Sequence, residues 1–252
     1  MIKKIVISAT IVLYKDSIET LQKTINCFLE TPLQKRLYLV DNSPTDTLKN
    51  LFNHPVITYI FIGKNNGFGR AHNLVIAQIK QLSTYHLILN PDVVFEPHVI
   101  PNLIRELEKN ESVSMISPKV IYPDGKYQYT CRKHPTIIEM ISRRLGINNT
   151  YVKKASYRDL DLTEPMFPDF IHGCFFVFKT YDFMLIDGFD ERYFLYMEDA
   201  DICRKIEKTK KKVLYQPTEV IEHLHRRSSA KKGKLFFYHL ASAFKYFKKW
   251  GF

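Results

Sequence analysis

The chain has 252 residues, enough for one large domain or two small ones with a sizeable core. Its formal net charge of +11 favours an anionic partner, such as nucleic acid, an anionic membrane surface or a phosphorylated substrate. No apolar run reaches the roughly 18 residues that span a bilayer, and the four cysteines form no CxxC pair. These features argue against a transmembrane protein and a disulfide framework, and we expect a reducing compartment.

The first half of the chain alternates predicted strands with predicted helices. Apolar segments predict strands at residues 3–14, 36–41, 56–63, 85–90 and 112–120. A helix is expected from Ser17, with one apolar face formed by Ile18, Leu21, Ile25, Phe28 and Leu29, and another at 97–110. Strands separated by helices predict an α/β fold with a parallel sheet covered on both faces.

The second half is less regular. Residues 122–130 predict a hairpin with Asp124-Gly125 at its turn, and residues 169–178 are strand-like and rich in aromatics. Residues 146–165 are polar and lack a pattern, so we expect a mobile loop there. Near Glu198 and Asp199 a helix is expected to begin, because Ile202 and Ile206 share a helical face. No change of composition marks a domain boundary.

Polar residues gather where the predicted strands end. They are Asp41-Asn42, Asn65-Asn66-Gly67 and Asn90-Pro91-Asp92. In open α/β sheets, ligands bind beyond the carboxyl ends of the strands, so these positions are candidates for a binding cleft. Each segment taken alone is equally compatible with an ordinary turn. Asp92 offers one carboxylate for Mg²⁺ or Mn²⁺, whose other ligands would be phosphate and water.

Three acids stand in the aromatic and aliphatic segment 193–206, which reads YFLYMEDADICRKI. Acids are favoured at the start of a helix by its dipole, and this explains one or two of the three. A carboxylate at that point is also suited to act as a general base. Further along, His223 and His225 alternate in a predicted strand, where imidazole is either a metal ligand or a solvated side chain.

In this order, the motifs resemble family-2 glycosyltransferases with the nucleotide-sugar-binding GT-A fold. The resemblance spans about residues 5–230 and rests on VLYK, VDNSPTD, NNGFGRAHN, LNPDVVF, GFDERYFLYMEDADIC and EHLHRRSS. The subgroup that the chain resembles most contains bacterial rhamnosyltransferases of surface-polysaccharide assembly. The resemblance implies a mostly parallel sheet flanked by helices, with a small antiparallel element. It places a nucleotide-binding part at about 1–118 and an acceptor-side part at about 119–230.

The resemblance also implies roles for individual residues. Asp199 matches the catalytic base, and Asp92 and His223 match metal ligands. Glu198, Asp201 and Gly173 would position the acceptor or neighbouring loops. The nucleotide sugar would be bound by Thr10, Tyr14, Asp41, Asn66, Gly67, Asn73 and Asn90.

Several positions depart from the family pattern. The metal-binding DXD motif is reduced to Asn90-Pro91-Asp92, which makes dependence on a metal less secure. Lys15 stands where many members have Asn, and His72 stands where some have a phosphate-contacting Arg. Lys205 stands where an Arg often follows the acidic pair that here is Glu198-Asp199. A QxxRW-like motif is absent from the sequence, which argues against a processive synthase.

The implied function is an inverting, non-processive sugar transfer. The donor would be a nucleoside-diphosphate sugar, with dTDP-L-rhamnose favoured over a UDP-hexose, and Mg²⁺ or Mn²⁺ would be the cofactor. The acceptor would be a saccharide hydroxyl, lipid-linked, in surface polysaccharide or lipopolysaccharide assembly. We expect a cytoplasmic protein on the inner face of the membrane.

The C-terminal residues 231–252 contain no acid. On a helix, one apolar stripe would contain Phe236, Leu240, Ala243, Phe244, Phe247 and Trp250, with Lys234, Lys245 and Lys249 opposite. This pattern is typical of an interfacial membrane helix. It is equally typical of a helix that packs on the core or on a second subunit in a homodimer.

Two other classes of function compete. Charge and aromatic content suit a nucleic-acid binder, but no recognised motif supports one, and we expect no nucleic-acid partner. A nucleotidyltransferase would need a glycine-rich basic loop after the first strand, where YKDSIE has no glycine.

Overall fold

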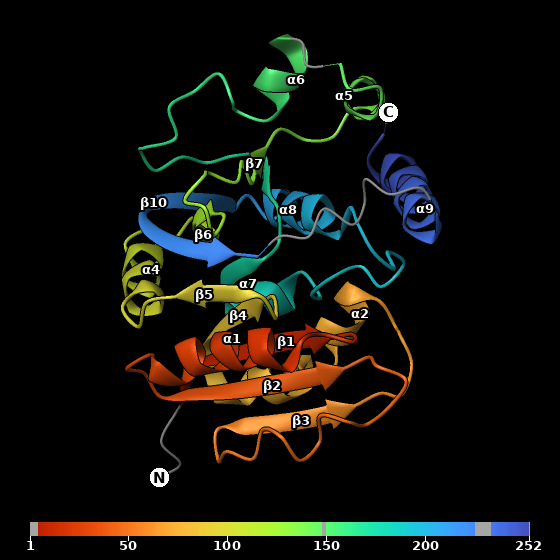
Figure 1. Cartoon of the computed structure of the whole chain (residues 1–252). Helices are drawn as coiled ribbons and strands as arrows, with labels where there is room; N and C mark the ends of the chain where they lie inside the picture. Colours follow the sequence, from red (N-terminus) through yellow and green to blue (C-terminus); the bar gives the residue numbers. More distant parts are fainter. Residues whose placement is uncertain (1–4, 148–149, 225–232, 252) are drawn as a thin grey trace.

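The structure, a computed structural model, describes residues 5–147, 150–224 and 233–251. Its centre is an eight-stranded mixed sheet of order β3-β2-β1-β4-β9-β6-β10-β5, and β7 and β8 form a small antiparallel pair. Figure 1 shows helices on both sides of the sheet, with α5 and α6 at the end of the molecule opposite β3. The predicted fold class is confirmed, including the small antiparallel element.

The first half alternates as the sequence predicts. Its elements are β1 (Ile5–Leu13), α1 (Ile18–Glu30), β2 (Lys35–Asp41), β3 (Ile57–Phe61), α2 (Phe68–Asn73), α3 (Ile76–Leu82) and β4 (Ser83–Leu89). Strands β3, β2, β1 and β4 run parallel to one another. Helix α1 buries Leu21, Ile25 and Phe28, whereas Ile18, expected on the same face, is exposed in the first turn.

The rest of the chain, from β5 onward, completes the sheet. It contains β5 (Val93–Phe95), α4 (Val99–Glu108), β6 (Val113–Ile121), β7 (Cys131–Arg132), α5 (Ile137–Arg144), α6 (Thr150–Ala155), β8 (Phe170–Ile171), β9 (Phe175–Lys179), α7 (Thr180–Leu185), α8 (Glu198–Lys208), β10 (Lys212–His223) and α9 (Lys234–Trp250). Strand β9 runs antiparallel to β4 and β6, so it inverts the local direction of the sheet. The sheet therefore joins strands from both halves of the chain.

The core lies on both faces of the sheet. Along β2, Leu37 and Leu39 pack into one buried cluster, while Tyr38 and Val40 pack into the other. Successive strand residues point to opposite faces, so a strand covered on both sides is apolar throughout. This explains why the parallel strands read as continuous apolar runs in the sequence.

Two expectations for the second half are corrected and one is confirmed. Residues 146–165, expected as a mobile loop, contain helix α6. Residues 169–178, expected as one strand, form β8 and β9 with an interruption at His172–Cys174. The turn at Asp124-Gly125 is confirmed, because the Gly125 N–H donates to the Tyr122 carbonyl and the Lys126 carbonyl accepts from Tyr122.

The C-terminal segment is a helix, but its apolar stripe divides. Ala243 and Phe247 pack into the core beside Tyr246, whereas Leu240 and Phe244 are exposed. Lys249, expected on the polar face, points inward to two aspartates. Thus the second half of α9 packs on the core.

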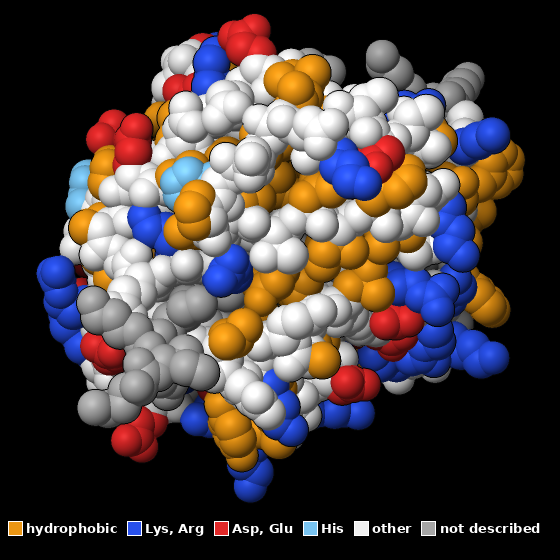
Figure 2. All heavy atoms as spheres, turned by 90° about the horizontal axis from the view of Figure 1, so that it is seen from below, with side chains coloured by type: hydrophobic (Ala, Val, Ile, Leu, Met, Phe, Trp, Pro, Cys, Tyr) orange, Lys and Arg blue, Asp and Glu red, His pale blue; other side chains and the backbone are white. Residues whose placement is uncertain are grey.

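Basic side chains are not confined to the C-terminal segment. Figure 2 views the molecule from below in Figure 1, the side where β3 lies, and shows lysine and arginine clusters around a band of hydrophobic side chains.

Within the described parts of the chain, no helix combines the length and hydropathy needed to cross a membrane.

Candidate active site

Asp199 lies in the first turn of α8, where the sequence predicted a helix start. One of its oxygens, Oδ2, is 3.5 Å from Nδ1 of His172. Its Oδ1 lies over Gly173 so closely that a Cβ atom there would be 2.5 Å away. Glycine at position 173 is therefore required for the approach of the carboxylate. The pair of carboxylate and imidazole is a suitable arrangement for a general base with a group that orients it.

Asp92 and His223 meet at the other side of the site. Asp92 Oδ1 is 3.3 Å from His223 Nε2, and Asn90 Nδ2 is 3.5 Å from the same nitrogen. His223 Nδ1 is 3.1 Å from Gln128 Oε1, and the Gln128 amide also donates to the His223 carbonyl. This contact orients the ring and aims Nε2 at Asp92, as the partners of metal-ligating histidines do.

The charge of His223 follows from its neighbours. Burial lowers the pKa of His223, but the nearby Cys174 sulfur and Asp92 carboxylate outweigh burial and raise the pKa to about 10. The imidazole is therefore a cation beside Asp92 near neutral pH. A divalent ion bound by both side chains would replace that proton and supply the same positive charge.

Few side chains at this place could bind a metal ion. Over the described ranges, no cluster of three or more His, Cys, Asp and Glu side chains could hold a metal ion. Asp92 and His223 offer one oxygen and one nitrogen, so a bound Mg²⁺ or Mn²⁺ would take its other ligands from phosphate and water. The residues present fit an ion that binds together with a diphosphate.

The segment His172–Cys174 connects the base to this pair. His172 and Gly173 contact Asp199, while the Cys174 carbonyl accepts from the Asn90 N–H at 2.9 Å. Because adjacent Cα atoms are only 3.8 Å apart, the interruption between β8 and β9 brings Asp199 and the pair of Asp92 and His223 to one place.

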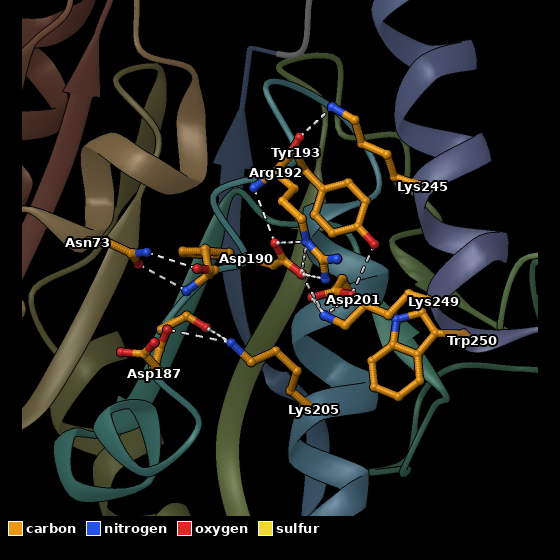
Figure 3. Close-up of polar contacts among 12 residues, drawn as sticks. Asn73, Asp187, Asp190, Arg192, Tyr193, Asp201, Lys205, Lys245, Lys249 and Trp250 are labelled. Atoms are coloured by element: carbon orange, nitrogen blue, oxygen red, sulfur yellow. Dashed lines mark hydrogen bonds and ion pairs between the residues drawn. The ribbon is translucent and has the colours of Figure 1, made fainter.

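Glu198 and Asp201 do not share the exposure of Asp199. Asp201 is 0% exposed, and Lys249 Nζ donates to both of its oxygens at 2.7 and 2.9 Å. The Trp250 indole and the Tyr193 hydroxyl also donate to Asp201 (Figure 3). The expected support of a neighbouring loop therefore agrees with its contacts, but direct contact of Asp201 with an acceptor is excluded by burial.

Helix α9 holds the segment that leads into α8. Lys245 donates to the Arg192 carbonyl, and Lys249 joins Asp190 at 2.7 Å (Figure 3). Ser242 donates to the Leu195 carbonyl. Immediately before Glu198, two successive residues, Tyr196 and Met197, adopt left-handed backbone conformations with φ of 72° and 69°. Such conformations persist where surrounding contacts impose them, and α9 supplies these contacts.

On the donor side, Tyr14 is exposed at the end of β1, and Lys15 lines a small pocket with Asp92 and Leu224. Asp41 ends β2 and is fully buried. Its oxygens accept from the Ser43 N–H at 2.8 Å and from the Tyr59 hydroxyl at 2.7 Å. A base contact by Asp41 would require one of these partners to move.

The turn before α2 packs against the segment that precedes α8. Gly67 has a φ of 85°, and a Cβ atom there would lie 2.3 Å from the Phe194 carbonyl oxygen. That carbonyl accepts from the Phe68 N–H, while the Gly67 carbonyl accepts from Asn42. Asn66 is half-buried in the same turn. Gly67 thus serves close backbone packing between the donor and acceptor sides.

Two residues predicted to bind the nucleotide have their side chains engaged elsewhere in the structure. Thr10 is in the middle of β1, fully buried, with its hydroxyl 3.3 Å from His86 Nε2, so it lines no cleft. The Asn73 amide is bonded to the backbone of Phe189, donating to its carbonyl at 2.8 Å and accepting from its N–H at 2.9 Å. Asn73 instead borders a separate pocket with Asp187 and Lys205 (Figure 3).

The positions that depart from the family pattern also differ in placement. His72 is buried, which keeps its pKa well below the usual value, so it offers no charge to a phosphate. Lys205 donates to the Gly188 carbonyl at 2.5 Å. The prediction for His225 lies outside the described residues.

Sequence reasoning missed three residues of the site. His172 stands next to the predicted Gly173, and that adjacency was the available signal. Gln128 and Lys249 reach the site from 95 and 48 residues away from their partners His223 and Asp201. No local pattern indicates such contacts.

The model of the family "Glycosyl transferase family 2" matches residues 8–182 of this chain. The chain belongs to this family. It is a glycosyltransferase, as the motifs predicted. Rhamnosyltransferase WbbL of Escherichia coli (strain K12) is 28% identical over an alignment of 244 positions that covers 92% of this chain and 88% of WbbL. N-acetylglucosaminyl-diphospho-decaprenol L-rhamnosyltransferase of Mycobacterium tuberculosis (strain ATCC 25618 / H37Rv) is 26% identical over 77% of this chain and 68% of its own length. The resemblance to rhamnosyltransferases is thus confirmed.

Solved structures support the GT-A fold of this family-2 glycosyltransferase. GalNAc-T7, crystallised with UDP, GalNAc and Mn²⁺, superposes with a TM-score of 0.65 at 17% identity, covering 89% of this chain. The mannosyltransferase PcManGT from Pyrobaculum calidifontis, in complex with GDP-Man and Mn²⁺, gives 0.61 at 13% identity, covering 91% of this chain. This chain spans 44% and 59% of those two longer chains.

Proposed function

We propose that this protein is an inverting, non-processive rhamnosyltransferase. The donor is dTDP-L-rhamnose, with a UDP-hexose as the alternative, and the acceptor is a hydroxyl of a lipid-linked saccharide in surface-polysaccharide or lipopolysaccharide assembly. Two of the similar proteins are named rhamnosyltransferases, and one name contains a diphospho-decaprenol acceptor. The observation that carries the proposal is the joining of Asp199 to the pair of Asp92 and His223 by the segment His172–Cys174.

Asp199 acts as the general base. It takes the proton of the acceptor hydroxyl while that oxygen attacks the anomeric carbon from the side opposite the diphosphate. The bond between the anomeric carbon and the diphosphate oxygen breaks, and the nucleoside diphosphate leaves with the electron pair. His172 keeps the carboxylate oriented through its 3.5 Å contact. A positioned base contributes roughly 10²–10⁴-fold to the rate.

Asp92 and His223 hold the divalent ion, Mg²⁺ or Mn²⁺. When bound, the ion offsets the negative charge that develops on the leaving diphosphate. Both solved neighbours described above contain Mn²⁺, which supports this proposal. Asn90 lies beside His223 and completes the polar end of the donor site.

The nucleotide lies between the ends of β1 and β2. The exposed Tyr14 ring faces the base and ribose, and the turn with Asn66 and Gly67 closes that side. Asp41 would reach the base only after the Tyr59 hydroxyl or the Ser43 N–H moves away from its carboxylate. Lys15 borders the pocket that contains Asp92, where its charge suits a phosphate. The reaction takes place at the cytoplasmic face of the membrane, where a lipid-linked acceptor is presented.

A ligand panel tests the donor. Thermal unfolding is measured with dTDP-rhamnose, UDP-hexoses, GDP-mannose and free nucleoside triphosphates, each with Mg²⁺, Mn²⁺ or EDTA. A ligand at 100 times its Kd stabilises by about 2.7 kcal/mol, which raises the Tm of a chain of this size by roughly 5–10 °C. We expect the largest shift with dTDP-rhamnose and metal. A shift with triphosphates alone would instead favour a nucleotidyltransferase.

The catalytic assignment is tested by Asp199→Asn. This variant keeps the donor-induced Tm shift, because the donor contacts are on other elements, and loses sugar transfer by at least about 10²-fold. Glu164→Gln, an exposed acid in the acceptor-side part, is the matched control. Wild-type turnover in Asp199→Asn would refute the role of Asp199.

A further inference from the structure

Helix α5 presents its apolar side to solvent. Ile138, Ile141 and Leu145 follow one another at helical spacing along α5 and just past its end, and they are 68%, 53% and 68% exposed. The acid of the helix, Glu139, is instead buried and contacts Arg143 at 3.3 Å. A surface helix usually buries its apolar stripe, so this reversed arrangement indicates that something else covers the stripe.

The first half of α9 has the same property. Phe237, Leu240 and Phe244 occupy successive turns and are 67%, 55% and 64% exposed. The neighbouring side of the helix packs on the core through Ala243, Tyr246 and Phe247. The contacts of α9 with the rest of the protein therefore leave this second apolar stripe uncovered.

The two stripes adjoin each other. The Arg144 guanidinium carbon lies 4.5 Å from the centre of the Phe236 ring, which joins the end of α5 to the start of α9. Phe236 and Leu240 are four residues apart, so they are neighbours on one side of α9. Ile141 precedes Arg144 by three residues, so these two are neighbours on one side of α5. Leu145 follows Arg144 directly, just past the end of the helix. We call the six exposed residues the α5–α9 surface: Ile138, Ile141, Leu145, Phe237, Leu240 and Phe244.

The two chain segments that carry this surface are strongly basic. Residues 132–158 contain seven Lys and Arg and one acid, the buried Glu139. Residues 233–251 contain four lysines and no acid. Arg144, Lys153, Lys154 and Lys234 are exposed. Exposed aromatic and branched apolar side chains, bordered by lysine and arginine, have the chemistry of a protein surface that enters the headgroup region of an anionic bilayer.

We propose that the α5–α9 surface docks on an anionic lipid bilayer. The six apolar side chains enter the interface, and the surrounding cations lie at the level of the lipid phosphates. A second copy of this chain fits less well, because the contact would bring two strongly positive rims together. The proposal deepens the membrane-side location in the proposed function, and it can be tested without catalysis.

Vesicle co-sedimentation tests the docking. The full chain is mixed with vesicles of phosphatidylcholine alone, or with roughly 30% phosphatidylglycerol added to supply the negative surface potential. Three variants are compared with wild type: Ile138→Ser/Ile141→Ser/Leu145→Ser, Phe237→Ser/Leu240→Ser/Phe244→Ser, and the control Tyr181→Ser/Leu185→Ser. The control changes two exposed apolar residues of α7, outside the α5–α9 surface.

We expect wild type and control to bind the anionic vesicles and to bind neutral ones more weakly. The partition coefficient of each triple variant should fall at least about ten-fold, because three apolar groups that would enter the bilayer are removed. Circular dichroism and Tm are measured to check that the variants are folded. We expect them to be folded, because the changed side chains are exposed. Equal sedimentation of wild type and both triple variants would overturn the proposal.

Two further outcomes would also overturn it. Wild type that binds no anionic vesicle has no such docking surface. A dimer in analytical ultracentrifugation that dissociates in the triple variants, without lipid binding, would assign the surface to a second copy. Sugar transfer to a water-soluble acceptor is measured in parallel. We expect this transfer to persist in the triple variants, so failure of docking and failure of the proposed reaction are distinguishable.

Discussion

Glu198 offers a quantitative test of the electrostatics next to the base. Its side chain is buried, with 6% of the residue exposed. Burial first, and the charge of Asp199 second, raise the pKa of Glu198 to about 8. Among the described residues, its Oε2 has no hydrogen-bond partner. The raised pKa of Glu198 therefore favours the protonated carboxyl at neutral pH.

The effect on stability has a definite sign. The pKa of Glu198 rises from 4.5 to about 8 on folding. The associated stability is fully present below about pH 4.5 and is lost as the pH rises through about 8. Each unit corresponds to about 1.4 kcal/mol, so a shift of about 3.5 units gives at most about 5 kcal/mol. Glu198→Gln cannot ionise and escapes this loss.

Thermal unfolding between pH 5 and pH 9 measures the difference. At pH 5 we expect the Tm values of Glu198→Gln and wild type to be close. At pH 9 the variant should be more stable by a few kcal/mol, which is roughly 5–10 °C in Tm for a chain of this length. Glu164→Gln, exposed on the surface, should follow wild type at every pH.

Activity gives the second half of the test. Glutamine resembles a protonated glutamic acid, so we expect Glu198→Gln to keep sugar transfer near the wild-type rate at pH 7. A variant that is destabilised equally at pH 5 and pH 9 would refute the raised pKa. A folded variant that no longer transfers sugar would show that Glu198, and not only Asp199, takes part in the reaction.

Three further predictions concern the surrounding contacts. In Gly173→Ala, the new Cβ would lie 2.5 Å from Asp199 Oδ1, so kcat should fall while the donor-induced Tm shift remains; an unchanged kcat would contradict the close approach. In Lys249→Met, the buried Asp201 loses its cation, and urea unfolding should show a loss of about 3 kcal/mol, whereas the exposed Lys248→Met should show almost none. In Asp92→Ala, calorimetric titration should find weaker donor binding that no longer responds to Mn²⁺ or EDTA; a metal response equal to wild type would remove Asp92 from the metal site.

The fold and the main site followed from local features of the sequence. Apolar runs marked the central strands, and polar residues at their ends marked Asp92. The helix start at Glu198 and Asp199 was predicted from adjacent residues, whereas the choice of Asp199 as the base came from the family resemblance. Each of these signals lies within a few residues of the feature that it predicts.

What the sequence could not supply depends on contacts between distant segments. Thr10 read as a cleft residue, but its strand is covered on both faces, so its side chain points into the core. Asn73 read as a nucleotide contact, but it bonds to Phe189, 116 residues away. The spacing of apolar residues predicted helix α9 correctly, but it did not show which side of the helix packs on the protein. Burial direction is a property of the assembled fold.

Helix α9 separates the α5–α9 surface from the segment that leads to Asp199. One of its sides bears Phe237 and Phe244, and the other holds Arg192 and Leu195 by their carbonyls. An α-helix with its side chains is about 10–12 Å across. In the docking proposed above, the segment that leads to Asp199 would therefore lie about one helix diameter above the lipid surface.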